Sequence, residues 1–320
     1  MARYDKPVLT FEEQIALLKR DGLRIDDERR MIRHLSNINY FRLCAYMRPF
    51  RQIVNKEEGN FKEGTSWDDI YDLYRFDRKF RLLIFDAIER IEVALRTQIV
   101  YQLGRKHGAH WQDKSELFKV VCYVDKKTGE RRTYCLYNEL QNHIDGVWTD
   151  TSCCDSFKRY SRKYSDPKNP PSWICMELMY FNELSKICKY LSDRQDVVGI
   201  AEYFGIQSEK VFCSWLHAIN YVRNICAHHA RLWNIRLSIQ PEKFSYKGED
   251  KIWLSNEEVD TIQSSRIYYF LCVILYLLQT VNPNSKFRKH FFDLLEEYPN
   301  IDVGYMGFPK NWREHPLWKK

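Results

Sequence analysis

The sequence lacks the motifs of nucleotide-dependent and redox enzymes. It contains no P-loop, no dinucleotide-binding glycine fingerprint and no set of kinase motifs, and its glycines at 104, 108 and 129 are isolated turn formers. Internal repeats and low-complexity tracts are missing as well. ATP-dependent and redox mechanisms therefore have no basis in the sequence, and we expect no cofactor.

Long apolar runs are also missing. The longest, from Ile267 to Leu278, falls short of the roughly 20 residues that a membrane-spanning helix needs, and we expect it to form a buried helix. Met1 to Thr10 contains no apolar run of the kind that marks a signal peptide. We therefore expect a cytoplasmic protein whose 10 cysteines are reduced thiols.

What the chain does contain fits a folded protein with a polar surface. Its 320 residues are enough to bury a substantial core. Charged residues make up 29% and the mean hydropathy is −0.55, which excludes a protein with many membrane spans. Aromatic residues, at 15%, are more frequent than in disordered chains. The net charge of +7 is a modest basic excess, compatible with nucleic-acid binding without establishing it.

Apolar residues that recur at intervals of three and four predict a mostly helical chain. The strongest pattern runs from 66 to about 103, a length that allows one break. Earlier helices are predicted from Thr10, whose hydroxyl is suited to an N-cap, to near Asp21 and Gly22, and from Asp26 and Asp27 toward Ser36. The other helical patterns cover 173–191, 208 to about 235, 257–280 and 285–298, and the pattern fails between 104 and 171.

The region between 104 and 171 contains the pattern of a β-hairpin. Strand-like runs flank the turn sequence Lys-Thr-Gly-Glu at 127–130 and predict a β-hairpin. With this turn, Tyr123 would face Tyr134 and Cys122 would face Cys135. A cross-strand disulfide is conceivable there, but a reducing compartment argues against it.

Two basic clusters belong to the same region. The hairpin tip carries more cations than a turn requires, namely Lys126, Lys127, Arg131 and Arg132. A second segment interleaves cations with tyrosines: Lys158, Arg159, Tyr160, Arg162, Lys163 and Tyr164. Cations neutralise phosphates and tyrosine rings stack unpaired bases, so we predict that these clusters form an RNA-binding arm. The alternative is a solvated loop that its charges keep soluble.

The densest group of chemically active side chains lies between 221 and 234. Here Arg223, Asn224, His228, His229 and Arg231 follow one another within about three helical turns. An imidazole can move a proton at neutral pH, and a guanidinium can hold the charge that develops on a phosphoryl group. These residue types can cleave RNA without a metal. The alternative is a polar helix face that happens to carry a histidine.

Helical periodicity divides this group into two faces. Asn224, His228 and Arg231 fall on one stripe, which we expect to face outward. The second stripe is apolar apart from His229, which we expect to be a buried core histidine; it contains Ile219, Val222, Cys226, His229 and Trp233. Arg223 can reach the edge of the outward face with its long side chain.

Other functions for nearby residues have weaker support. Glu92 and Arg96 are spaced as an i, i+4 ion pair; either could orient the polar groups of the histidine helix, although a solvated pair is the simpler reading. Cys213, His217, Cys226 and His229 could in principle bind zinc, but structural zinc ligands usually lie on tight knuckles and not along helices. We therefore expect no metal.

Several sequence blocks, in this order along the chain, carry a family resemblance. The blocks are 38–50, 73–97, 170–186, 223–234 and 306–312, and the fourth contains an arginine, four intervening residues and a histidine, Arg223 and His228. Together they resemble the abortive-infection (Abi) family of the AbiD/AbiF type, which belongs to the HEPN superfamily. His229 would fit the same motif with five intervening residues. Asn182 stands where relatives usually carry glycine, and we expect this to alter a turn and not the chemistry.

The resemblance implies an all-α fold, a HEPN-like helical bundle. In this reading residues 1–65 form an amino-terminal helical extension. Residues 66–282 form the core, with the basic β-hairpin and loop inserted at about 105–171. Residues 283–320 form a carboxy-terminal segment packed on the core.

The resemblance also implies a metal-independent RNA endonuclease of an antiphage system, in which the 2′-hydroxyl attacks the phosphorus and leaves a 2′,3′-cyclic phosphate. His228 would act as acid or base, Arg223 would stabilise the transition state and Asn224 would position the phosphate or the imidazole. A homodimer is expected. So is an inhibitory partner, for which we favour a structured RNA because the sequence reveals no apolar groove for a protein. The alternative is a non-catalytic HEPN module that binds RNA as a sensor or scaffold.

Overall fold

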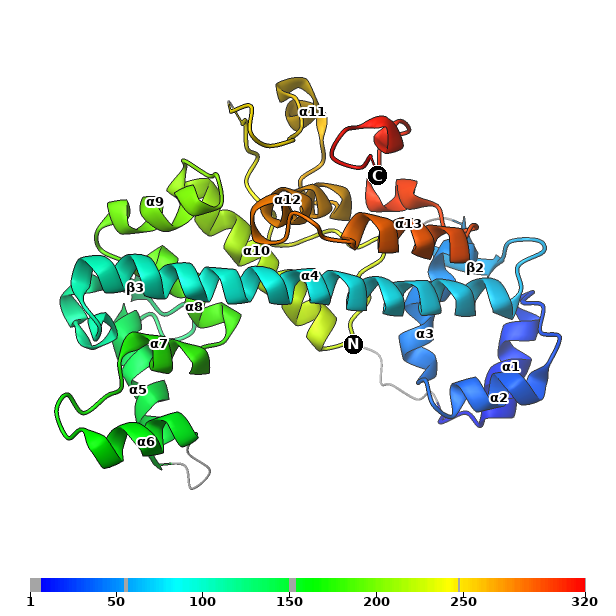
Figure 1. Cartoon of the computed structure of the whole chain (residues 1–320). Helices are drawn as coiled ribbons and strands as arrows, with labels where there is room; N and C mark the ends of the chain where they lie inside the picture. Colours follow the sequence, from blue (N-terminus) through cyan, green and yellow to red (C-terminus); the bar gives the residue numbers. More distant parts are fainter. Residues whose placement is uncertain (1–6, 55–56, 150–153, 247, 320) are drawn as a thin grey trace. The chain divides into compact units, whose positions relative to one another are not determined.

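The computed structural model describes residues 7–54, 57–149, 154–246 and 248–319. Within these ranges the chain is mostly helical and contains two small antiparallel sheets, each of two strands. Figure 1 labels the helices and strands along the chain. The chain divides into two compact units, Met1–Leu83 with Lys289–Asp302 and Ile84–Arg288 with Val303–Lys320. The predicted extension, core and carboxy-terminal segment are a different division and stay predictions.

The first unit is built from short, well-capped helices. The hydroxyl of Thr10 caps its first helix, and Glu13 returns a bond to the Thr10 amide, which completes a capping box. Asp27 caps the second helix through the amide of Arg30. Both helices predicted here are confirmed. The elements of this unit are α1 (Phe11–Arg20), α2 (Glu28–Leu35), α3 (Tyr40–Met47), strands β1 (Arg51–Val54) and β2 (Glu57–Phe61), the start of α4 (Trp67–His107) and most of α13 (Phe287–Glu297).

A buried polar cluster joins α3 to α4 inside this unit. The Tyr46 hydroxyl donates to Asp77 at 2.6 Å, and Arg81 forms an ion pair with the same carboxylate. All three side chains are buried, with relative exposures between 0% and 5%. A buried charge is stable only when it is paired, so this cluster fixes how α3 packs on α4.

The second unit holds the rest of α4 and the helices that surround it. The apolar helix α12 is its centre, because every residue from Ile267 to Leu278 is buried, as the sequence predicts. The other elements are β3 (Val120–Val124), β4 (Arg131–Cys135), α5 (Leu136–Thr149), α6 (Asp155–Lys163), α7 (Ser172–Cys175), α8 (Phe181–Tyr190), α9 (Arg194–Tyr203), α10 (Glu209–Ala227), α11 (Asn256–Thr261) and α12 (Ile267–Val281).

Several predicted boundaries are wrong. α4 continues without the break that its length allowed, over 41 residues. The sequence pattern predicts no helix between 104 and 171, yet this region contains α5 and α6. The segment 173–191 is interrupted between α7 and α8, and 257–280 is interrupted between α11 and α12. In both cases apolar periodicity continues across a bend because both halves pack on one core.

The predicted hairpin is present, but its predicted register is wrong. Val121 pairs with Tyr134 and Cys122 pairs with Thr133. The turn is a longer loop in which the amides of Asp125 and Gly129 bond back across the end of the hairpin. Cys122 and Cys135 are therefore not opposite each other, and both are free thiols.

Among the described residues, no helix is long and apolar enough to cross a membrane.

Candidate functional site at the end of helix α10

Helix α10 begins where the sequence predicts and ends earlier. The Ser208 hydroxyl caps its first turn, but the last helical residue is Ala227, and the predicted continuation to about 235 is wrong. The amide of His229 donates to the Cys226 carbonyl at 3.1 Å, and the amide of Ala230 donates to the Ile225 carbonyl at 3.0 Å. This pair of bonds is the Schellman motif that closes many helices, usually with a glycine in the left-handed position.

That left-handed position is occupied by His229, which has a φ of 57°. Its side chain is exposed, so the prediction that His229 is a buried core histidine is wrong. Arg231 lies beyond the helix on the irregular segment and no longer shares a stripe with His228. The expected second stripe also ends at Cys226 for the same reason. Helical periodicity could not reveal this, because the residues after the turn keep an apolar pattern.

Asn224 and His228 remain neighbours. His228 is the C-cap residue, and its amide donates to the Asn224 carbonyl at 2.9 Å, so the two side chains lie one turn apart on the last turn of α10. Both side chains are exposed. The predicted pairing of carboxamide and imidazole on one outward face is therefore present.

Arg223 lies against the part of helix α4 that belongs to the same unit. Its guanidinium carbon is 5.9 Å from the centre of the Phe85 ring. The Nε atom is buried and has no hydrogen-bond partner among the described residues. Because Nε itself has almost no accessible surface, a ligand could reach the guanidinium only through its other nitrogens.

The chain after the histidines is anchored to the core. Leu232 and Trp233 are buried, with relative exposures of 0% and 2%. Asn234 adopts a φ of 53°, and its Oδ1 accepts from Arg266 Nη1 at 3.0 Å. Arg266, which sequence reasoning missed, thus holds the segment that follows His228. These contacts anchor the segment that follows α10 and so restrict where the end of the helix can lie.

Glu92 and Arg96 support a neighbouring segment. Arg96 bonds to Glu92 at 3.1 Å and also donates to the backbone carbonyls of Met176 at 3.0 Å and Met179 at 3.1 Å. Both side chains of the pair are largely buried, so it is not the solvated pair that spacing alone suggests. Arg96 fixes the bend between α7 and α8; no described contact joins it to Arg223 or His228.

The alternative zinc set does not converge. Cys213 and Cys226 are 13 positions apart on α10, which places them about 20 Å apart along the helix axis. The Cys213 thiol accepts from Arg194 and donates to the Cys188 carbonyl, and burial raises the pKa of Cys213. No group of three or more metal-ligating side chains is found in the part of the chain that the structure describes.

The basic residues of the hairpin tip are exposed. Arg132 is 3.3 Å from Asp125 and 3.2 Å from Glu130, so part of its charge is neutralised within the hairpin. Lys126, Lys127 and Arg131 form no ion pair with the described residues. Three cations at this tip are therefore available to a partner.

The second basic cluster lies on helix α6 and not in a loop. Phe157 is buried against Trp148 of α5, with ring centres 4.9 Å apart, and this contact docks α6. Tyr160 faces inward, where its hydroxyl donates to the Pro167 carbonyl at 2.8 Å. Tyr164 is 49% exposed. Of the two tyrosines in this cluster, Tyr164 is the more exposed, and Lys163 Nζ lies 5.3 Å from the centre of its ring.

The other members of the α6 cluster are cations. Lys158 is half-buried, and the others, Arg159, Arg162 and Lys163, are exposed. The hairpin leads directly into the start of α5, whereas α6 packs near the end of that helix. Strand β4 separates the hairpin tip from the start of α5, and the α6 cluster lies near the other end of α5, so the two clusters belong to different elements.

The hairpin also exposes apolar side chains. Val120 is 65% exposed and Val124 is 57% exposed, and both point to the same face as Cys122. The preference for an RNA inhibitor rests on the lack of an apolar surface in the sequence. The two exposed valines do not decide between an RNA and a protein, so this preference stays a prediction.

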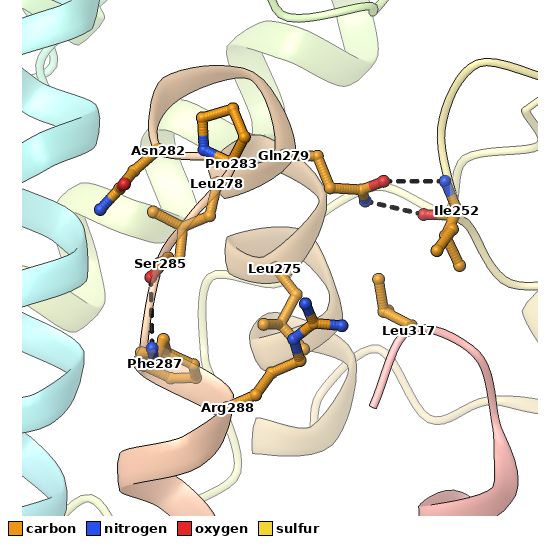
Figure 2. Close-up of a pocket in the computed structure, with 10 residues that line it drawn as sticks. All are labelled: Ile252, Leu275, Leu278, Gln279, Asn282, Pro283, Ser285, Phe287, Arg288 and Leu317. Atoms are coloured by element: carbon orange, nitrogen blue, oxygen red, sulfur yellow. Dashed lines mark hydrogen bonds between the residues drawn. The ribbon is translucent and has the colours of Figure 1, made fainter. Parts of the chain in front are cut away.

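A pocket elsewhere in the second unit lacks the chemistry of a reaction site. Figure 2 shows this pocket, of about 70 Å³, where α12 meets the start of α13. Gln279 bonds to both the amide and the carbonyl of Ile252 on its rim. Arg288 is the one charged residue among the ten that line the pocket. Its lining offers no pair of groups that could exchange protons with a substrate.

Comparison with known proteins points to one family. A family model described as Abi-like protein matches residues 33–234, which is more than half of the chain and includes Arg223 and His228. No curated protein and no solved structure matches the chain.

Proposed function

The chain belongs to the Abi-like protein family, and from this premise we propose that it is a metal-independent RNA endonuclease of an abortive-infection system. The family connects the chain with abortive infection, in which an infected cell stops growing. We also infer that the helices of the second unit form a HEPN-like bundle. The nuclease activity rests on the site at the end of α10.

One observation carries the proposal most strongly. Arg223, Asn224 and His228 gather at the carboxy-terminal end of α10, where the carboxamide and the imidazole are exposed and the arginine is half-buried. A phosphate oxygen is the acceptor that a guanidinium binds best. Phe85 lies beside the guanidinium, with 5.9 Å between the guanidinium carbon and the ring centre, and this contact would favour one position of the group.

The proposed reaction needs two proton transfers. A base removes the proton of the RNA 2′-hydroxyl as its oxygen bonds to the adjacent phosphorus, and an acid protonates the departing 5′-oxygen as the P–O bond breaks. His228 supplies one of these groups, because an imidazole exchanges protons near neutral pH. Arg223 stabilises the charge that gathers on the phosphoryl oxygens, and Asn224 orients the phosphate or the imidazole. Products carry 2′,3′-cyclic phosphate and 5′-hydroxyl ends.

A homodimer would complete this site. An isologous contact places the same residues of both copies around one two-fold axis. Two His228 side chains would then serve as acid and base, and two Arg223 side chains would surround the phosphate. A fully active monomer would contradict this arrangement.

The basic clusters are proposed to hold RNA. The cations Lys158, Arg159, Arg162 and Lys163 of α6, with those of the hairpin, would contact phosphates along a strand, and Tyr164 would stack a base. Changing the four α6 cations to glutamate should weaken RNA binding and flatten its salt dependence. Unchanged affinity would refute this part of the proposal. An inhibitory partner, either a structured RNA or a protein, would hold the activity in check in healthy cells.

The test is cleavage of total RNA by the purified full chain in EDTA. Wild type should cleave, His228→Ala should lose activity by at least about 100-fold, as removal of a general acid or base does, and His290→Ala should be unaffected. His290 is an exposed histidine on α13 and controls for loss of an arbitrary imidazole. If wild type binds RNA but does not cleave it, the site is a phosphate-binding module of a sensor or scaffold.

A further inference from the structure

Tyr180 has a fixed backbone and an exposed ring. Its side chain is 63% exposed where it precedes α8. Its own amide donates to Glu183 Oε2 at 2.6 Å, and the carbonyl of the preceding residue, Met179, accepts from Arg96 Nη2 at 3.1 Å. Glu183 and Arg96 therefore bind the backbone at Tyr180 and at the residue before it, while most of the Tyr180 side chain is exposed to solvent.

The groups that hold Tyr180 are themselves buried and partnered. Glu183 has a relative exposure of 8%, and its second oxygen, Oε1, lies 2.6 Å from His143 Nδ1. The imidazole of His143 is 5.7 Å from the Tyr180 ring, centre to centre. Glu183 is thus held by His143 and in turn holds the backbone that presents the exposed ring of Tyr180.

Two routes through the structure place Tyr180 near Arg223. Asn182, two residues after Tyr180, accepts from Asn220 Nδ2 at 3.3 Å, and Asn220 lies one turn before Arg223 on α10. Along α4, Phe85 lies beside Arg223 and Arg96 binds Met179. The route along α4 covers about 16 Å between Phe85 and Arg96, a length that a few nucleotides of RNA can span.

We propose that Tyr180 stacks an unpaired base of the RNA whose phosphate Arg223 binds. This inference rests on the proposed function and adds the substrate class, which is RNA that is single-stranded beside the cleaved bond. A base inside a duplex cannot present its face to a side chain, whereas an unpaired base stacks readily on an aromatic ring. Such stacking tolerates any base, so Tyr180 selects strandedness and not sequence.

The test measures binding separately from cleavage. In the full-length His228→Ala background and in EDTA, the affinity for a short single-stranded RNA with one 2-aminopurine is compared with that for the matching duplex. Tyr180→Ala should weaken single-strand binding by roughly 5- to 100-fold and remove the quenching of 2-aminopurine fluorescence. Tyr180→Phe should keep both, because it retains the ring. Tyr203→Ala removes a tyrosine that is 41% exposed on α9 and should have no effect.

The outcomes separate this inference from the proposed function. If wild type cleaves RNA and Tyr180→Ala binds single strands as well as wild type does, the inference fails and the nuclease stands. If Tyr180→Ala changes the oligomeric state instead of RNA affinity, the ring belongs to a subunit interface and the inference is overturned. If wild type neither binds nor cleaves RNA, the proposed function fails together with it.

Discussion

The left-handed residue that ends α10 allows a sharp test of the site. His229 has a φ of 57° where helices of this kind usually carry glycine. We compare His229→Gly with His229→Ala, because both remove the imidazole and every contact it makes, while alanine alone keeps a β-carbon in the left-handed region. The difference between the two variants therefore reports the backbone and not the side chain.

The expected difference follows from two opposing effects. A β-carbon in the left-handed conformation costs roughly 1–2 kcal/mol. Glycine avoids this cost but loses more conformational entropy on folding, which lowers the stability of the glycine variant by roughly 0.5–1 kcal/mol. His229→Gly should therefore be more stable than His229→Ala by up to about 1.5 kcal/mol in urea unfolding. A more stable alanine variant would show that α10 does not end in this left-handed turn.

The same pair of variants also decides which histidine is catalytic. If His228 exchanges the proton, both His229 variants should cleave RNA within a few-fold of wild type. Loss of cleavage in both, with folding intact by circular dichroism, would assign the chemistry to His229. Loss in alanine but not in glycine would show that the shape of the turn is what matters.

Three further predictions concern groups outside the site. Arg81→Ala should lower the free energy of unfolding by about 3–5 kcal/mol in urea titration, because it leaves the buried Asp77 carboxylate uncompensated; a loss under 1 kcal/mol would contradict the pairing. Thr10→Ala should cost about 1 kcal/mol through loss of the α1 capping box, and no change would mean that the cap is not formed. Burial lowers the pKa of Lys251 from 10.5 to about 8. The unfolded chain therefore binds more protons between pH 8 and 10.5, so stability should rise with pH in that window relative to Lys251→Met, and a parallel pH profile in the two proteins would contradict this.

The sequence predicts the local elements well where one signal dominates. The capped helices α1 and α2, the long α4 and the buried α12 all follow from caps and periodicity that tertiary contacts do not override. Periodicity misses α6 because its sequence is mostly polar, with two inward aromatic residues, Phe157 and Tyr160, that give too short a pattern to detect. The predicted hairpin register is wrong because the loop is longer than a two-residue turn.

The sequence predicts which residues make up the candidate site, but it does not predict how they are arranged in space. The cluster of Arg223, Asn224 and His228 is visible in the sequence, and the structure keeps Asn224 and His228 together. The end of α10 is not predictable, because a histidine takes the position that glycine usually marks. The placement of Tyr180 depends on bonds between residues far apart in the chain, such as Arg96 to Met179, which no local pattern contains.

The most direct test of the central claim is cleavage of a defined RNA in EDTA, compared with the same RNA carrying a single 2′-deoxy nucleotide at the cleaved position. If the 2′-hydroxyl is the nucleophile, the deoxy substitution should abolish cleavage at that bond alone. The unmodified RNA should yield a 2′,3′-cyclic phosphate. Cleavage of the deoxy bond, or a linear 3′-phosphate or 3′-hydroxyl as the first product, would contradict the mechanism proposed for Arg223 and His228.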